Sequence, residues 1–297
     1  MKRRKAAVWI LLGQSNAVGH GLPMTDDDII RKPLENVYGL HRNRNQSFDS
    51  RELVWENYIS SGMNLAEEQD NTYSIANCLA KQWQMQIDRG NPHGLPDLYI
   101  IQIAIGAEGV TEGYMWHPDR EPRLIPGMLG TVDISLFPFS LHIFRLLAQS
   151  FAAHNTEYDI IGVHWRGGEN DVTQTKEYLS EHLEDTYAAI IEAFGDSLGT
   201  PPLILHRIVC PDRMLDMDPT GKCLENMHEI NRVFDRLQDR YRNVTVFDPR
   251  SYPQYEEGIR GNGLFIEDMV HFSSDVNQWI ANRILEEYIH NTTRKDN

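Results

Sequence analysis

Short apolar runs alternate with longer amphipathic stretches along most of this chain. Such alternation is typical of a parallel β-sheet whose strands are connected by helices. The apolar runs are rich in β-branched and aromatic residues, as strands buried on both faces are. We expect strands at residues 7–12, 37–40, 98–105, 160–165, 203–209 and 244–248.

The stretches between these runs repeat their apolar residues at the 3.6-residue period of an amphipathic helix. Ile75, Leu79, Trp83 and Ile87 form the first such face. Further helical faces are expected at residues 141–151, 178–194, 227–241 and 273–288. The two periods together predict the α/β class, with a mainly parallel central sheet.

The length of 297 residues fits either two average domains or one large α/β domain. No internal repeat divides the chain, so we expect a single domain over residues 1–297. Its extra length collects in polar loops that follow strands, at about residues 41–71, 108–136, 211–222 and 249–266. Ligands of open α/β sheets bind beyond the carboxyl ends of the strands, so these loops are expected to line a site.

Composition and charge exclude several classes of function. Hydrophobic residues make up 41% of the chain, enough for a sizeable core. Lys and Arg number 28 against 43 Asp and Glu, which gives a net charge of −15. Because an acidic surface repels phosphate backbones, no nucleic-acid partner is expected.

The basic residues 2–5 and the apolar run that follows them imitate a secretory signal. No small-residue cleavage site follows, so a first β-strand is the preferred interpretation. No stretch approaches the roughly 18 apolar residues of a membrane helix, and no membrane partner is expected. The cysteines, Cys78, Cys210 and Cys223, form no disulfide framework, which favours a cytoplasmic location.

No metal or cofactor is expected. The histidines show neither H-E-x-x-H nor H-x-H spacing, and the cysteines show no C-x-x-C pair.

The first candidate for chemistry is Ser15, in the sequence Gly-Gln-Ser-Asn directly after the first predicted strand. A serine at a tight strand-to-helix turn is exposed at the end of its strand, where it can act as a nucleophile. The alternative is an ordinary helix N-cap. The site is not the nucleophile elbow of α/β-hydrolases, because Ala17 stands where that motif requires glycine.

A second candidate is the Asp268–His271 pair just before the last predicted helix. An acid three residues before a histidine can bind the ring Nδ1 and orient Nε2 as a general base. The alternative is an ordinary surface pair.

Two glycine-containing segments also follow strands. In residues 167–171, two glycines allow close approach of a ligand, and the Asn170 amide can donate to an oxyanion. The alternative is a polar turn in which Asp171 caps a helix. In residues 105–109, Gly106 offers a backbone N–H that no Cβ obstructs.

These motifs occur in the order Ser, Gly, Asn, Asp/His, and the chain resembles the SGNH (GDSL-like) hydrolases. The resemblance covers residues 7 to about 290. It is closest to the carbohydrate acetylesterase branch, the sialate O-acetylesterase-like and acetyl xylan esterase-like proteins. Residues 13–16 reproduce that branch's G-Q-S-N opening, residues 164–171 are similar to its W-x-Q-G-E-S-D segment, and residues 268–271 match its D-x-x-H block.

The resemblance implies a three-layer α/β/α, flavodoxin-like fold and a serine esterase that removes O-acetyl groups from a carbohydrate. Sialic acid, xylan and related acetylated glycans are the implied substrates. Ser15 would be the nucleophile, His271 the general base and Asp268 its orienting partner. The oxyanion hole would consist of the Ser15 and Gly106 backbone N–H groups and the Asn170 side-chain amide.

The sequence departs from the family pattern at two positions, and both concern hydrogen-bond donors of the expected site. Gly167 follows Arg166 where the branch often has glutamine, and Ala107 replaces the second glycine of a common pair. Arg166 is a candidate to bind an anionic substrate, together with Arg42, Arg44, Arg120 and Arg123 in the long loops.

Three further residues are expected in or around the site. Gln14 and Glu169 are expected to support it. Trp116 either stacks on a sugar ring or packs in the protein.

Two alternative functions remain open at this stage. The first is a lipase, thioesterase or acyltransferase on the same scaffold, which would prefer acyl chains longer than acetyl. The second is a carbohydrate-binding relative without catalytic activity, which the complete set of Ser, Gly, Asn, Asp and His disfavours.

Overall fold

The computed structural model describes residues 4–20, 22, 30–60, 63–66, 73–119, 123–125 and 132–295. Its strands are β1 (Arg4–Gly13), β2 (Val37–Leu40), β3 (Trp55–Asn57), β4 (Leu65–Ala66), β5 (Asp97–Ala104), β6 (Arg123–Ile125), β7 (Val132–Ile134), β8 (Thr156–Arg166), β9 (Leu203–His206) and β10 (Val244–Phe247). Its α-helices are α1 (Ser15–Val18), α2 (Arg42–Asn45), α3 (Ile75–Asp88), α4 (Leu136–Ala153), α5 (Lys176–Leu198), α6 (Asp212–Met217), α7 (Lys222–Arg240) and α8 (Ser274–Lys295).

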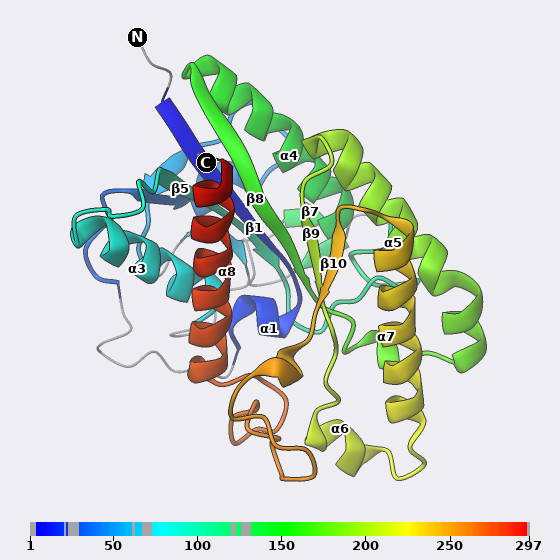
Figure 1. Ribbon diagram of the computed structural model, residues 1–297. Coiled ribbons are helices and arrows are strands. Elements are labelled where there is room, and N and C mark those ends of the chain that lie inside the picture. The colour runs from blue at the N-terminus through cyan, green and yellow to red at the C-terminus, as the bar shows by residue number, and fades with distance from the viewer. Residues whose placement is uncertain are drawn as a thin grey trace.

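The central sheet has the strand order β10-β9-β8-β1-β5-β2-β3, with β4 paired to β5. All of its neighbouring strands are parallel except β2 and β3. The six strands expected from the sequence are all present, and the mainly parallel sheet is confirmed (Figure 1). The strands that were not expected, β3, β4, β6 and β7, are two or three residues long.

The central strand β1 contributes side chains to both faces of the sheet. Val8, Ile10 and Leu12 point into the core on one face, and Trp9 and Leu11 point into the core on the other. All of these side chains are buried. This is why β1 has a continuous apolar sequence instead of alternating polar and apolar residues.

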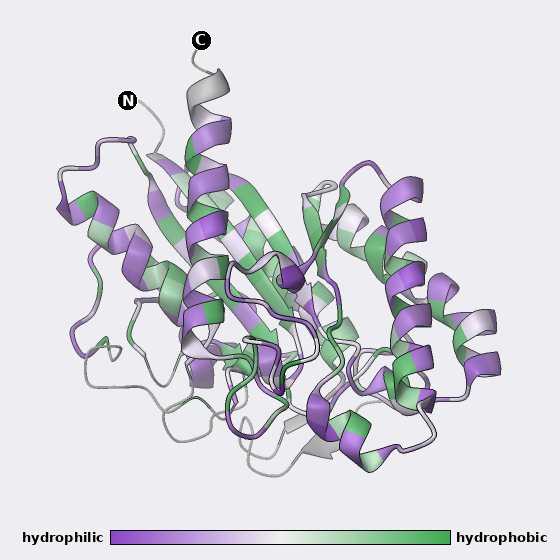
Figure 2. Cartoon of the chain, turned by 60° about the horizontal axis from the view of Figure 1, so that its bottom comes forward, coloured by the Kyte–Doolittle hydropathy of each residue, from purple (hydrophilic) through white to green (hydrophobic). Residues whose placement is uncertain are grey.

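Helices cover both faces, which confirms the three-layer α/β/α class. The helices α4, α5 and α7 pack together on one face, and α3 and α8 pack together on the other. Their apolar stripes face the sheet and their polar stripes face outward (Figure 2). The burial of these stripes is the main source of helix stability in a fold of this kind.

One helix has the length and composition of a membrane span, although no such stretch was expected from the sequence. Over the described residues, α4 is 18 residues long and sufficiently apolar, but 61% of it is buried inside the protein. Phe139, Phe144 and Leu147 of this helix belong to the core. Its apolar composition is therefore explained by packing against the sheet and α5.

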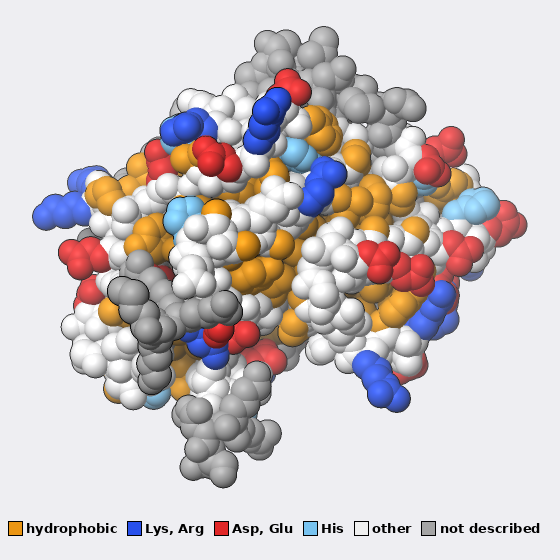
Figure 3. Space-filling view, turned by 90° about the horizontal axis from the view of Figure 1, so that it is seen from above, with side chains coloured by type: hydrophobic (Ala, Val, Ile, Leu, Met, Phe, Trp, Pro, Cys, Tyr) orange, Lys and Arg blue, Asp and Glu red, His pale blue; other side chains and the backbone are white. Residues whose placement is uncertain are grey.

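The two ends of the sheet differ in what they carry. The end nearer the chain termini exposes apolar side chains between charged ones (Figure 3). A cavity of about 850 Å³ lies between α8 and the strands β8, β9 and β10. The opposite end, where the central strands finish, carries the polar motifs described next.

Candidate active site

Three neighbouring strands end at the same level of the sheet. Gly13 at the end of β1 pairs with Ala104 of β5 on one side and with Arg166 of β8 on the other. The Ser15 turn, the Gly106 turn and the loop 167–171 therefore begin side by side at one edge. The parallel register brings together segments that are about 150 residues apart in sequence.

The turn that carries Ser15 requires a glycine before it. Gly13 has a φ of +140°, and a Cβ there would lie 1.9 Å from the Arg166 carbonyl oxygen. The backbone N–H of Gln14 donates to that same carbonyl at 3.0 Å. The indole N–H of Trp116 donates to the Gly13 carbonyl at 3.1 Å. These contacts fix the start of α1, whose first residue is Ser15, with 9% of its surface exposed.

Asp268 and His271 form a hydrogen-bonded pair. The His271 Nδ1 lies 2.6 Å from one Asp268 carboxylate oxygen, and the other oxygen accepts the backbone N–H groups of Val270 and His271 at 2.9 and 3.0 Å. Met269 adopts a left-handed φ of 58° so that the chain can turn around the carboxylate. Burial raises the pKa of Asp268, but these hydrogen bonds outweigh it and hold the pKa below its usual value. The carboxylate is therefore ionised at neutral pH and can orient the imidazole.

Asn16 connects the serine turn to the histidine loop. Its Oδ1 accepts the backbone N–H of Phe272 at 3.0 Å, and its Nδ2 donates to Glu169 Oε1 at 3.1 Å. The backbone N–H of His20 donates to the Ser15 carbonyl, and its ring packs edge-on against His271 with centroids 5.8 Å apart. Residues from three motifs thus meet around the turn of Ser15. Sequence reasoning quoted Asn16 as part of the motif but assigned it no role.

The predicted oxyanion donors lie in the two flanking segments. Ile105 donates its backbone N–H to the Gly13 carbonyl at 3.3 Å, which aligns the Gly106 turn with the serine turn. Asn170 follows β8, and its Nδ2 is buried with no hydrogen-bond partner among the described residues. Buried donors without a partner are uncommon in native proteins, which makes this amide a candidate for a functional role.

Ala107 occupies a conformation that favours glycine. Its φ is 59°, in the left-handed region. The family resemblance gives a second glycine at this position, which a left-handed backbone favours. Alanine in this conformation carries strain of about 1 kcal/mol.

Asp171 fixes the loop that follows β5. Its carboxylate accepts the backbone N–H groups of Val110 and Thr111 and, at 2.7 Å, the Thr111 hydroxyl. Burial raises its pKa to about 6, although the hydrogen bonds from Thr111 and Val110 lower it. A Cβ at Gly109 would lie 2.3 Å from this carboxylate. The structure thus assigns Asp171 a loop-holding contact where the sequence suggested a helix cap.

Arg166 lies inside the protein instead of facing an open site. Its side chain is 2% exposed, and its guanidinium carbon lies 3.9 Å from the centroid of the Phe272 ring. Burial lowers its pKa to about 10, although the nearby Glu169 carboxylate raises it. The buried cation therefore supports the residue that follows His271. Gln14 is buried as well, next to Ser15.

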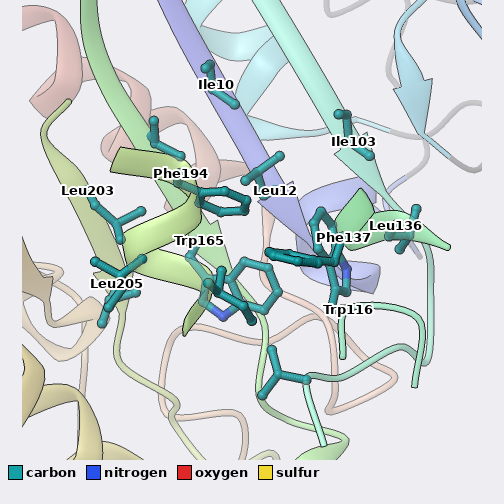
Figure 4. Close-up of a cluster of buried hydrophobic side chains, with 14 of the residues drawn as sticks. Ile10, Leu12, Ile103, Trp116, Leu136, Phe137, Trp165, Phe194, Leu203 and Leu205 are labelled. Carbon is teal, nitrogen blue, oxygen red and sulfur yellow. The ribbon is translucent and has the colours of Figure 1, made fainter. Parts of the chain in front are cut away.

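Trp116 lacks the exposure that sugar stacking needs, so the structure supports the second alternative, packing in the protein, and rules out substrate contact by this ring. Its side chain is fully buried and packs edge-on against Trp165, with ring centroids 5.0 Å apart (Figure 4). Its ring supports the serine turn from the core.

Two of the loop arginines, Arg42 and Arg44, have described side chains, and that of Arg44 is exposed. Arg42 donates to the Met63 carbonyl at 3.3 Å. The prediction for Arg120 lies outside the described residues, and the side chain of Arg123 is also outside them. The described part of the chain holds no group of three or more His, Cys, Asp or Glu side chains placed to bind a metal ion.

Comparisons with known proteins place the fold. No family model matches the chain, and no curated protein matches it. The solved structure of NanS has a TM-score of 0.60 at 16% identity, over 99% of each chain. A protein from Arabidopsis thaliana has a TM-score of 0.57 at 14% identity, over 94% of this chain and 98% of that chain. Because both identities are low, these likenesses show only that the chain has the same fold as both proteins.

Proposed function

We propose that this protein is a serine esterase that removes O-acetyl groups from a carbohydrate through an acetyl-enzyme intermediate. The observation that carries the proposal is the Asp268–His271 pair, which Asn16 joins to the turn of Ser15. A hydroxyl, an imidazole oriented by a carboxylate and an unpaired amide at one strand edge are the groups that acyl transfer needs.

The proposed mechanism uses the side chains of this chain alone. His271 takes the Ser15 hydroxyl proton as the serine oxygen attacks the acetyl carbon. The N–H groups of Ser15, Gly106 and the Asn170 amide stabilise the oxyanion that forms. The sugar alcohol leaves with the proton from His271. Water then attacks the acetyl-enzyme and gives a proton to His271. The bond between the acyl carbon and the Ser15 oxygen breaks, His271 returns the proton to that oxygen, and acetic acid leaves and ionises to acetate.

One observation supports an acetylated carbohydrate as substrate. The Gly-Gln-Ser-Asn opening and the Asp-x-x-His block resemble those of the carbohydrate acetylesterase branch of the SGNH hydrolases. The likeness to NanS along the whole chain supports the fold on which this chemistry is proposed.

The proposal is tested by measuring acetate release from a panel of acetylated sugars. We expect release from at least one acetylated glycan, and faster hydrolysis of 4-nitrophenyl acetate than of the butyrate and longer esters. A preference for butyrate or longer chains would favour a lipase or thioesterase on the same scaffold.

Asn170→Ala tests the oxyanion hole. We expect kcat to fall by about 10²–10³-fold, because one donor to the oxyanion is lost. The melting temperature should stay close to that of the wild type, because the Nδ2 atom has no described partner to lose. Thr173→Ala serves as the control, since it removes a hydrogen bond to the Asn170 carbonyl and no group that faces the serine. An equal loss of activity in both variants would contradict the assigned role.

A further inference from the structure

A cavity of about 700 Å³ opens at the carboxyl ends of β9 and β10, beside the candidate active site. Its volume is typical of small-molecule sites, which measure about 300–1,000 Å³. The floor includes the buried residues Ile208, Met227 and Asn231. The walls come from α6, the first turns of α7 and residues 255–262.

The cavity adjoins the loop that carries His271. The backbone N–H of Arg213, next to the lining residue Asp212, donates to the Met269 carbonyl at 3.4 Å. A Cβ at Gly261, between two lining residues, would lie 3.5 Å from the Met269 sulfur. Residues next to the cavity lining therefore contact the turn between Asp268 and His271.

Its position determines which part of a substrate it can receive. In acyl transfer, the histidine returns its proton to the leaving oxygen, so the leaving group lies on the histidine side of the nucleophile. We propose that this cavity binds the leaving alcohol and that this alcohol is a neutral oligosaccharide. This inference rests on the proposed esterase function and adds a location and a charge class for the substrate.

The charges that line the cavity are paired. Arg260 binds Asp216 at 3.1 Å, and Arg250 binds Asp248 at 2.6 Å. The remaining lining arginines also have carboxylate partners: Arg207 binds Asp235 and Asp248, and Arg232 binds Glu229. Because each cation already faces a carboxylate, the cavity offers no surplus positive charge to an anionic sugar. A neutral ligand with many hydroxyl groups fits this lining.

Apolar side chains border the cavity. Leu215, Leu224 and Ile259 line it and are 40%, 36% and 48% exposed. They come from α6, α7 and the loop before the histidine, at the end of the molecule that comes forward in Figure 2. Large exposed apolar side chains that gather around a cavity indicate a contact surface. Tyr255 adds an aromatic ring, and sugars present C–H faces that pack on such side chains.

The test uses two variants of the exposed border. The double variant Leu215→Ser/Ile259→Ser removes two lining side chains. Met217→Ser is the matched control, because Met217 is 75% exposed on the same helix and does not line the cavity. The substrates are acetylated xylotriose, O-acetylated sialic acid and 4-nitrophenyl acetate, whose small leaving group makes few contacts with the border.

We expect the double variant to lower kcat/KM for acetylated xylotriose by about tenfold and to change that for 4-nitrophenyl acetate by less than about twofold. Met217→Ser should match the wild type on both. The wild type should prefer acetylated xylotriose to acetylated sialic acid. Unchanged xylotriose hydrolysis, an equal loss on both esters or a preference for sialic acid would each overturn the inference.

Failure of the proposed function has a different signature. If the wild type hydrolyses none of the three esters, the esterase assignment fails. Calorimetric titration of xylotriose into the wild type and the double variant then tests the cavity alone. Binding that weakens in the double variant and persists in Met217→Ser would show a carbohydrate site without catalysis, and absence of binding would overturn the cavity as well.

Discussion

Ser15→Ala is expected to abolish ester hydrolysis and to leave the fold intact. Loss of a catalytic serine nucleophile typically lowers kcat by about 10⁵–10⁶-fold. The described contacts of Ser15 use its carbonyl oxygen, which accepts the N–H groups of Gly19 and His20, and alanine keeps both. The measurement is kcat/KM for 4-nitrophenyl acetate beside the melting temperature. Ser140→Ala is the control, since that serine is also buried but lies on α4.

An organophosphonate probe tests the same serine without a substrate. It should label the wild type on the peptide that contains Ser15 and should not label Ser15→Ala. Undiminished turnover in Ser15→Ala would refute the nucleophile. Folded wild-type protein that is neither labelled nor active would favour the carbohydrate-binding alternative.

The fold was predictable because its main strands and helices are long enough to contain several repeats of their apolar pattern. The strand β1 and the helices α3 and α7 each span several repeats of their pattern, so their type follows from the sequence alone. The strands β4 and β6 have two and three residues, which is too short for a period to appear. The apolar α4 shows the limit of composition, because burial and membrane insertion favour the same residues.

Residue spacing alone predicts contacts within the candidate site only between groups that are close in sequence. Asp268 and His271 are three residues apart, and their hydrogen bond follows from that spacing. The bond from Phe272 to Asn16 joins residues 256 apart, and no local pattern indicates it. Trp116 illustrates the same limit, since its partner is the Gly13 carbonyl 103 residues away.

Backbone strain also marks this site. Ala107 and Met269 are both left-handed, and each lies in one of the loops that form the site. In the described part of the chain, four of the other five non-glycine residues with positive φ are asparagines, which tolerate this conformation better than most side chains. Strain at alanine and methionine costs stability. Such strain persists where the surrounding structure fixes the backbone, and it is concentrated at functional sites.

Asp268→Asn separates the electrostatic role of this carboxylate from its structural one. Asparagine can keep an oxygen toward the N–H groups of Val270 and His271, so the turn should remain. The substitution exchanges the carboxylate that fixes the imidazole tautomer for a neutral amide. The corresponding change in serine proteases lowers kcat by about 10⁴-fold. We expect a loss of that order with little change in KM. Asp275→Asn, at the exposed start of α8, is the control.

The pH dependence of stability gives a second readout of the same variant. The pKa of Asp268 is lowered in the folded protein, so its carboxylate contributes stability above its unfolded pKa of about 4. That contribution is lost as the pH falls through the folded value. The melting temperature of Asp268→Asn should therefore lie below that of the wild type at pH 7 and approach it at about pH 3. A kcat within tenfold of the wild type, with the melting temperature lowered equally at both pH values, would reduce Asp268 to a structural residue of the turn.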